Sequence, residues 1–155
     1  MTMVFDGEVF ADYFQFYLAD VNAPLDELPS WDKDDLRRRL VAAKGAVVFR
    51  TAQNEYVQVQ VSFQTEEPED EPDAVHIAEC SLETTGNIMI AGCTDYVGDA
   101  HRFSVSPGRL RVSFQCVGAG SVSESDNAKN SLYRVKIWPS EDRTVFLKRE
   151  RRIAG

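Results

Sequence analysis

The stretch Tyr56-Val-Gln-Val-Gln-Val-Ser-Phe63 alternates apolar and polar side chains without a break. Because successive side chains of a β-strand point to opposite faces of a sheet, its valines and Phe63 share one face and its polar residues share the other. Such two-faced strands are typical of antiparallel sheets that cover a core on one side. The stretch therefore predicts a half-buried strand, and the fold class follows from how often the pattern recurs.

The same alternation recurs at Arg109–Cys116 and at Leu132–Trp138. Weaker strand candidates are residues 3–10, 13–19, 46–51, 75–84, 87–92, 101–106 and 143–149. Thr85-Gly-Asn87 and Ser106-Pro-Gly108 are turn sequences that join neighbouring strands as hairpins. About ten short strands with turns this frequent predict a mostly β chain, an antiparallel β-sandwich that spans residues 1–155 as a single domain.

One helix is expected within this series of strands. Asp32 is a good N-cap, and Asp34 and Asp35 follow in the first turn, where the helix dipole favours negative charge. Gly45 is placed to end the helix in the left-handed conformation. The pattern predicts one α-helix near residues 32–44, which lies across one end or edge of the sandwich.

Composition limits the compartment and the covalent chemistry. No window approaches the roughly 18 apolar residues of a membrane span, and the N-terminus has neither a basic nor an apolar signal segment. We therefore expect a cytoplasmic protein that does not enter membranes. Cys80, Cys93 and Cys116 are odd in number, widely spaced and set in apolar runs, which predicts buried free thiols rather than disulfides.

The charge of the chain is unevenly distributed. Residues 1–100 carry 20 Asp and Glu against 6 Lys and Arg, whereas residues 101–155 carry 5 against 11, for a net charge of −8. Six of the acids fall between Thr65 and Asp73. This acidic loop, residues 65–73, contains two prolines and reads as a loosely held, solvated connection. Residues 118–130 are small and polar and predict a second, flexible loop.

Catalytic and metal-binding patterns are missing from the sequence. The two histidines, His76 and His101, have no recognised spacing to a nucleophile, so no catalytic residue is expected. Zinc-type pairs of Cys and His are absent, and the acidic loop lacks the glycine of a calcium-binding loop. Gly118-Ala-Gly-Ser121 is not followed by the lysine of a phosphate-binding loop. We expect no enzyme, no metal and no cofactor.

Nucleic acid is also disfavoured as a partner, because the chain is acidic, with a pI near 4.8. Its cations gather in the C-terminal part, where Arg109, Arg111, Arg134 and Lys136 are expected on one outer sheet face and a short basic tail begins at Lys148. We interpret these cations as offsetting acids elsewhere in the fold and as blunting an edge strand.

Several stretches resemble the bacterial competence protein J family of nuclease inhibitors. The similarity covers roughly residues 12–117, and its most distinctive part is a Trp-acid helix start followed by Gly-x-x-x-Phe. The matching stretches are Tyr13-Phe-Gln-Phe16, Trp31-Asp-Lys-Asp-Asp35, Ala42–Phe49, Gly86–Ile90, Arg102–Gly108 and Leu110–Ser113. The acidic loop and the basic tail depart from the family pattern.

The resemblance implies a small acidic protein that binds a DNA-degrading enzyme and blocks it. Carboxylates on a rigid scaffold can occupy a basic, phosphate-binding active site and associate with it quickly. The partner expected from the resemblance is a basic protein, with a nuclease as the candidate, and the oligomeric state stays open. The partner-binding residues predicted on this hypothesis are Asp32, Asp34, Asp35, Glu66, Glu67, Glu69, Asp70, Glu71 and Asp73.

Two alternatives stay open at this point. A small-ligand or carbohydrate-binding β-sandwich without catalysis would use exposed aromatic rings, for which Tyr56, Tyr96 and Trp138 are the candidates. On the second alternative the acidic loop serves solubility alone, as most charged runs do.

Overall fold

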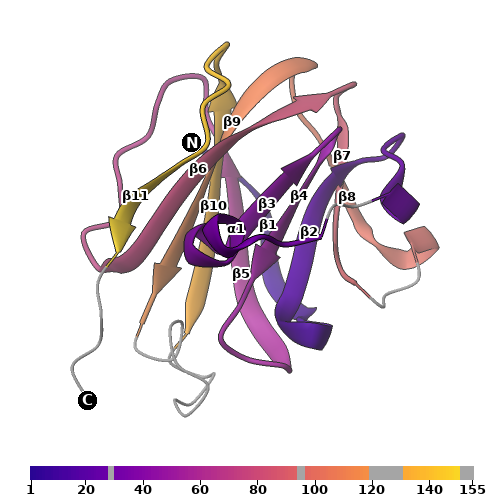
Figure 1. Ribbon diagram of the computed structural model, residues 1–155. Helices are drawn as coiled ribbons and strands as arrows, with labels where there is room; N and C mark the ends of the chain where they lie inside the picture. The colour runs from indigo at the N-terminus through magenta and orange to yellow at the C-terminus, as the bar shows by residue number, and fades with distance from the viewer. Residues whose placement is uncertain (28–29, 94–96, 119–130, 151–155) are drawn as a thin grey trace, which may run out of the picture.

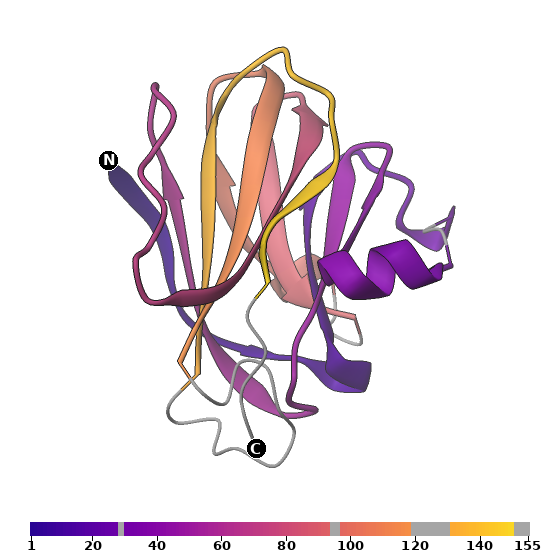
Figure 2. The same ribbon diagram turned by 60° about the vertical axis from the view of Figure 1, so that its left-hand side comes forward.

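The computed structural model describes the chain except for residues 28–29, 94–96, 119–130 and 151–155. Its described strands form two sheets that face each other, as Figures 1 and 2 show. The expected β-sandwich is confirmed, with one short α-helix. The flexible loop predicted at residues 118–130 falls almost entirely outside the described residues.

The larger sheet, sheet A, has six strands in the order β1-β5-β10-β9-β6-β11. Its strands are β1 (Thr2–Phe10), β5 (Tyr56–Phe63), β10 (Leu132–Pro139), β9 (Gly108–Val117), β6 (Ala74–Thr84) and β11 (Phe146–Glu150). The three strands with the clearest alternation, β5, β9 and β10, lie next to one another in the middle of this sheet. The β5–β10 pair is parallel and departs from the expected antiparallel pattern, whereas the other described pairs are antiparallel.

The smaller sheet, sheet B, has five strands in the order β3-β4-β2-β7-β8. They are β3 (Leu40–Ala43), β4 (Ala46–Arg50), β2 (Gln15–Asp20), β7 (Asn87–Gly92) and β8 (His101–Ser104). The inner face of sheet B meets sheet A, and its outer face carries a second apolar cluster around Tyr17 and Met89, against which Trp31 packs. Its central strands are therefore buried on both faces.

The main core lies between the two sheets. Phe16 and Phe49 from sheet B meet Phe114 and Tyr133 from sheet A, and all four side chains are fully buried. The Phe114 ring lies 4.7 Å from Phe49 and 5.8 Å from Tyr133, measured between ring centroids. The residues predicted to face inward on β5, β9 and β10 belong to this core.

The helix is shorter than expected. α1 spans Lys33–Arg38 and begins at the predicted N-cap, Asp32. It ends at Arg39, which adopts the left-handed conformation with φ of 62°. The second half of the predicted helix, residues 40–43, instead forms β3 and pairs with β4, so the prediction is wrong there. Gly45, expected to end the helix, lies in the β3–β4 turn with φ of 71°.

Two short 3₁₀ segments frame the strand β2, and a third precedes β8. They are η1 (Asp12–Phe14), η2 (Leu25–Glu27) and η3 (Val97–Asp99). The helix α1 contacts β3 at the edge of sheet B and β11 at the edge of sheet A. It therefore covers one open side of the sandwich, which we call the helix seam. The opposite side, between β1 of sheet A and β7–β8 of sheet B, is called the open seam.

His76 joins the helix to sheet A. Its Nε2 lies 2.7 Å from the backbone carbonyl of Arg38, and because a carbonyl only accepts, Nε2 carries the proton. The imidazole is buried against the ring of Phe114. Burial is the main reason that the pKa of His76 falls from 6.5 to about 4, and the positive charge of Arg39 acts in the same direction.

This shift predicts acid sensitivity. Between pH 6.5 and pH 4 the unfolded chain binds a proton at residue 76 and the folded chain does not, so the free energy of unfolding falls as the pH falls. We expect a loss of about 2–3 kcal/mol between pH 7 and pH 4.5 from this group. Urea unfolding of wild type and His76→Gln across this range measures it. The variant should show a shallower slope, and equal slopes would contradict the assignment.

Candidate functional site

The acidic loop crosses the outer face of sheet A (Figure 2). Its backbone is held there by side chains of β9 and β10. Lys136 Nζ donates to the carbonyl of Glu69 at 2.7 Å, and the N–H of Glu71 donates to the side-chain oxygen of Gln115 at 2.9 Å. On its other side, Arg149 of β11 donates to the carbonyls of Glu71 and Ala74. The loop is therefore anchored at several points and is held more firmly than its composition predicted.

Two of the six loop carboxylates make ion pairs inside the molecule. Glu71 Oε1 contacts both Arg134, at 2.5 Å, and Lys136, at 2.9 Å, on β10. Asp70 Oδ2 lies 2.8 Å from Nζ of Lys148 on β11. Burial alone would raise the pKa of Glu71, but hydrogen bonds from Lys136 and Arg134 outweigh it and lower that pKa. These two acids fasten the loop to the sheet.

The remaining four acids of the loop face solvent. Their side chains form no ion pair within the described part of the chain, and each residue is exposed. They are Glu66, Glu67, Glu69 and Asp73. The predicted loop site thus divides into an anchoring pair and four outward-facing carboxylates.

The outer-face cations offset acids of the same chain, as we interpreted, but they do not blunt an edge strand, because β9 and β10 are inner strands of sheet A. Arg111 is buried and pairs with the equally buried Glu79 at 3.3 Å, and Arg109 lies 3.5 Å from Glu83. With Arg134 and Lys136 on Glu71, each of the four predicted cations contacts an acid of the same chain. The positive charges of this face are therefore compensated within the chain.

The helix acids differ in their roles. Asp32 Oδ1 accepts from the backbone N–H of Asp35 at 2.7 Å, and Asp35 Oδ2 accepts from that of Asp32 at 3.1 Å. This reciprocal pair is a capping box, and the hydrogen bond from Asp35 N–H is the main reason that the pKa of Asp32 is lowered. Asp35 also pairs with Arg38. Asp34 takes no part in the box and is exposed.

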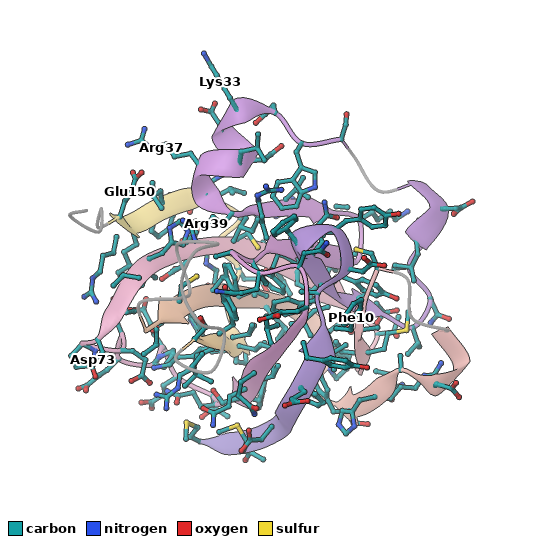
Figure 3. The ribbon with its side chains drawn as sticks, turned by 90° about the horizontal axis from the view of Figure 1, so that it is seen from below. Phe10, Lys33, Arg37, Arg39, Asp73 and Glu150 are labelled. Atoms are coloured by element: carbon teal, nitrogen blue, oxygen red, sulfur yellow. The ribbon has the colours of Figure 1, made fainter. Side chains whose placement is uncertain are left out.

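The structure does not bring the two predicted acidic groups together. β11 lies between them, with Lys148 reaching Asp70 of the loop and Glu150 pairing with Arg37 of the helix at 3.0 Å. Figure 3 shows the separation, with Asp73 on the loop side and Lys33 on the helix side of Glu150. The carboxylate-rich surface predicted from the sequence is therefore two separate patches.

Sequence reasoning missed Asp20, a buried carboxylate at the end of β2. Its oxygens accept from the hydroxyls of Thr84 and Thr85 and from the N–H groups of Thr85 and Asn22. Burial is the largest single effect and would raise the pKa of Asp20, but these hydrogen bonds together outweigh it and lower that pKa. The signal available in the sequence was that this acid directly follows an apolar run, Phe16–Ala19. Asp20 therefore ties the β6–β7 hairpin to β2.

Two further expectations, that the three thiols are buried and that three aromatic residues are exposed, are only partly met. Cys80 and Cys116 are buried, and burial raises the pKa of each thiol to about 12. Cys93 is exposed, so the expectation of a buried thiol is wrong there. Among the aromatic residues named for a sugar site, Trp138 is buried and Tyr56 is 61% exposed, whereas Tyr96 lies outside the described residues.

Metal and membrane features are likewise absent from the described part of the structure. No three His, Cys, Asp or Glu side chains in the described ranges come together in a way that could hold a metal ion. Among the described helices, none combines the length and the apolar composition of a membrane-crossing segment.

Comparison with known proteins relates this chain to one protein family. The family model for competence protein J (ComJ) matches residues 8–138. A solved structure of ComJ from Bacillus subtilis, described as an inhibitor of the DNA-degrading activity of NucA, is similar with a TM-score of 0.72 and 14% identity, over 90% of this chain and 98% of that one. A structure described as crocagin biosynthetic gene J follows with a TM-score of 0.61 and 16% identity, over 88% and 96%. No curated protein sequence matches the chain.

The extent of the family match decides the relationship. It covers most of the chain, from within β1 to the end of β10, and includes every stretch on which the sequence resemblance rests. The structural similarity extends over nearly the whole of both solved chains and shows the shared two-sheet fold. The chain belongs to the competence protein J family.

Proposed function

We propose that this protein binds a DNA-degrading nuclease in the bacterial cytoplasm and inhibits it without catalysing a reaction. The observation that carries the proposal is the family match, together with the shared fold of a ComJ that inhibits the DNA-degrading activity of NucA. The outward-facing carboxylates of the acidic loop are the contact surface, and a basic protein is the complementary partner.

The anchored loop suits this role physically. Glu66, Glu67 and Glu69 point to solvent from a backbone that Lys136 and Gln115 hold in place. A preorganised loop loses less conformational entropy on binding than a free one. Its carboxylates can meet the cations that a nuclease uses for phosphate, and long-range attraction between opposite charges accelerates the encounter.

The proposal is tested by inhibition of NucA. Purified NucA, a fluorescent DNA substrate and increasing amounts of this protein should give a loss of DNA degradation that saturates near equimolar ratio. Glu66→Gln/Glu67→Gln/Glu69→Gln should reduce the association rate about tenfold at low salt and flatten its salt dependence. Stopped-flow association over a salt series measures both quantities.

A charge-matched control separates this surface from net charge. Asp26→Asn/Glu55→Gln/Glu141→Gln also removes three exposed negative charges, from other parts of the surface. This control should keep nearly wild-type association. Equal slowing by both triple variants would show that total charge matters and the loop does not, and undiminished DNA degradation at excess protein would refute the inhibition of NucA.

The anchoring role of Glu71 gives a separate prediction. Glu71→Gln leaves Arg134 and Lys136 without their carboxylate, so the loop should detach more often and the free energy of unfolding should fall by about 1 kcal/mol. Hydrogen exchange followed by mass spectrometry should show faster exchange across residues 64–74. Glu66→Gln, which removes an outward charge from the same loop, should leave the exchange unchanged. Matching exchange in Glu71→Gln and wild type would contradict the anchoring role.

A further inference from the structure

The open seam contains a groove that the proposed inhibitory surface does not use. It is a cavity of about 380 Å³ between β1 and β5 of sheet A on one side and β7 and β8 of sheet B, with the preceding segment η3, on the other. Figure 3 shows its labelled member, Phe10, well away from Asp73 of the acidic loop and from Lys33 of the helix. The aromatic and charged residues that line it are Phe5, Glu8, Phe10, Tyr56, Asp99 and His101.

Two ring pairs give the groove aromatic walls. Phe10 and Tyr56 are directly opposite each other across the β1–β5 ladder, and their rings meet edge to face with centroids 4.9 Å apart. Phe5 and His101 lie 5.0 Å apart, and His101 Nε2 donates to the backbone carbonyl of Val4 at 3.2 Å. Tyr56 is 61% exposed. The walls are therefore held by the sheets and still accessible from solvent.

The charge of the groove is negative and uncompensated. Glu8 and Asp99 are exposed, and neither forms an ion pair or a side-chain hydrogen bond with another described residue. Among the described residues that line the groove there is no lysine or arginine. Glu71 and Asp70 of the acidic loop, in contrast, already have cations beside them.

We propose that this groove receives an arginine side chain from a basic partner protein. A guanidinium ion is attracted to aromatic faces, and its planar fork of N–H donors suits carboxylates better than the ammonium of lysine does. Exposed Tyr and partner Arg residues are also enriched among the residues that dominate binding energy at protein interfaces. A neutral sugar could stack on Tyr56 but would leave both carboxylates without a counter-charge. The proposal does not depend on the inhibition of a nuclease.

A model peptide tests the proposal directly. The peptide acetyl-Gly-Arg-Gly-amide is titrated into the ¹⁵N-labelled full chain at low salt and neutral pH, and amide resonances are followed. We expect saturable shifts that cluster at residues 8–10, 56 and 99–101, with an affinity in the millimolar range. The same peptide with neutral citrulline in place of arginine should give no saturable shifts there. Equal responses to both peptides, or no response to the arginine peptide, would overturn the proposal.

Variants of the groove make the test specific. Glu8→Gln/Asp99→Asn should weaken peptide binding about tenfold, and Tyr56→Ala should weaken it roughly threefold. Asp26→Asn/Glu141→Gln removes the same charge from elsewhere on the surface and should bind like wild type. Undiminished binding in Glu8→Gln/Asp99→Asn, or an equal loss of affinity in the control, would refute the site. Maltotriose is the neutral probe, and saturable shifts at the same residues with it would assign the groove to sugars instead.

Discussion

The aromatic contact between the two sheets is the constraint on which the rest of the structure depends. Phe16 and Phe49 of sheet B pack on Phe114 and Tyr133 of sheet A, and burial of each such ring contributes about 2–3 kcal/mol. Because side chains alternate along a strand, fixing Tyr133, Val135 and Ile137 inward sets Arg134 and Lys136 on the outer face. The position of the cations that hold the acidic loop is therefore a consequence of core packing.

Geometry then decides which acids of the loop turn inward. Arg134 and Lys136 are two residues apart on β10, so their heads lie side by side and a single carboxylate, Glu71, contacts both. A partly buried carboxylate needs such partners to offset its lost hydration. Its neighbours Glu66, Glu67 and Glu69 form no ion pair with a described cation and remain in solvent, so one loop both binds the sheet and displays charge outward.

Sequence reasoning succeeded where one face of a strand is buried and failed where tertiary contacts override local pattern. The alternation of β5, β9 and β10 predicted their inner faces correctly. The helix was extended too far because Leu40–Ala43 fits a helical stripe, yet Arg39 takes a left-handed turn and the following residues pair with β4. In the acidic loop, composition identified six carboxylates but not their roles, because the difference between Glu71 and Glu69 lies in contacts with distant strands.

A two-sheet sandwich has two open sides, and this protein closes them differently. At the helix seam, α1 is fixed by the His76 contact with the Arg38 carbonyl. At the open seam, rings do the covering, since Phe5 packs against the core and His101 satisfies the outward carbonyl of edge strand β1. The aromatic walls thus have a structural reason, but Glu8 and Asp99 have none: they neither pair nor cap within the described chain. The rings are needed to cover this edge of the sandwich, whereas the two carboxylates beside them are not needed by the fold. This combination is the reason for proposing a binding groove here and not only a covered edge.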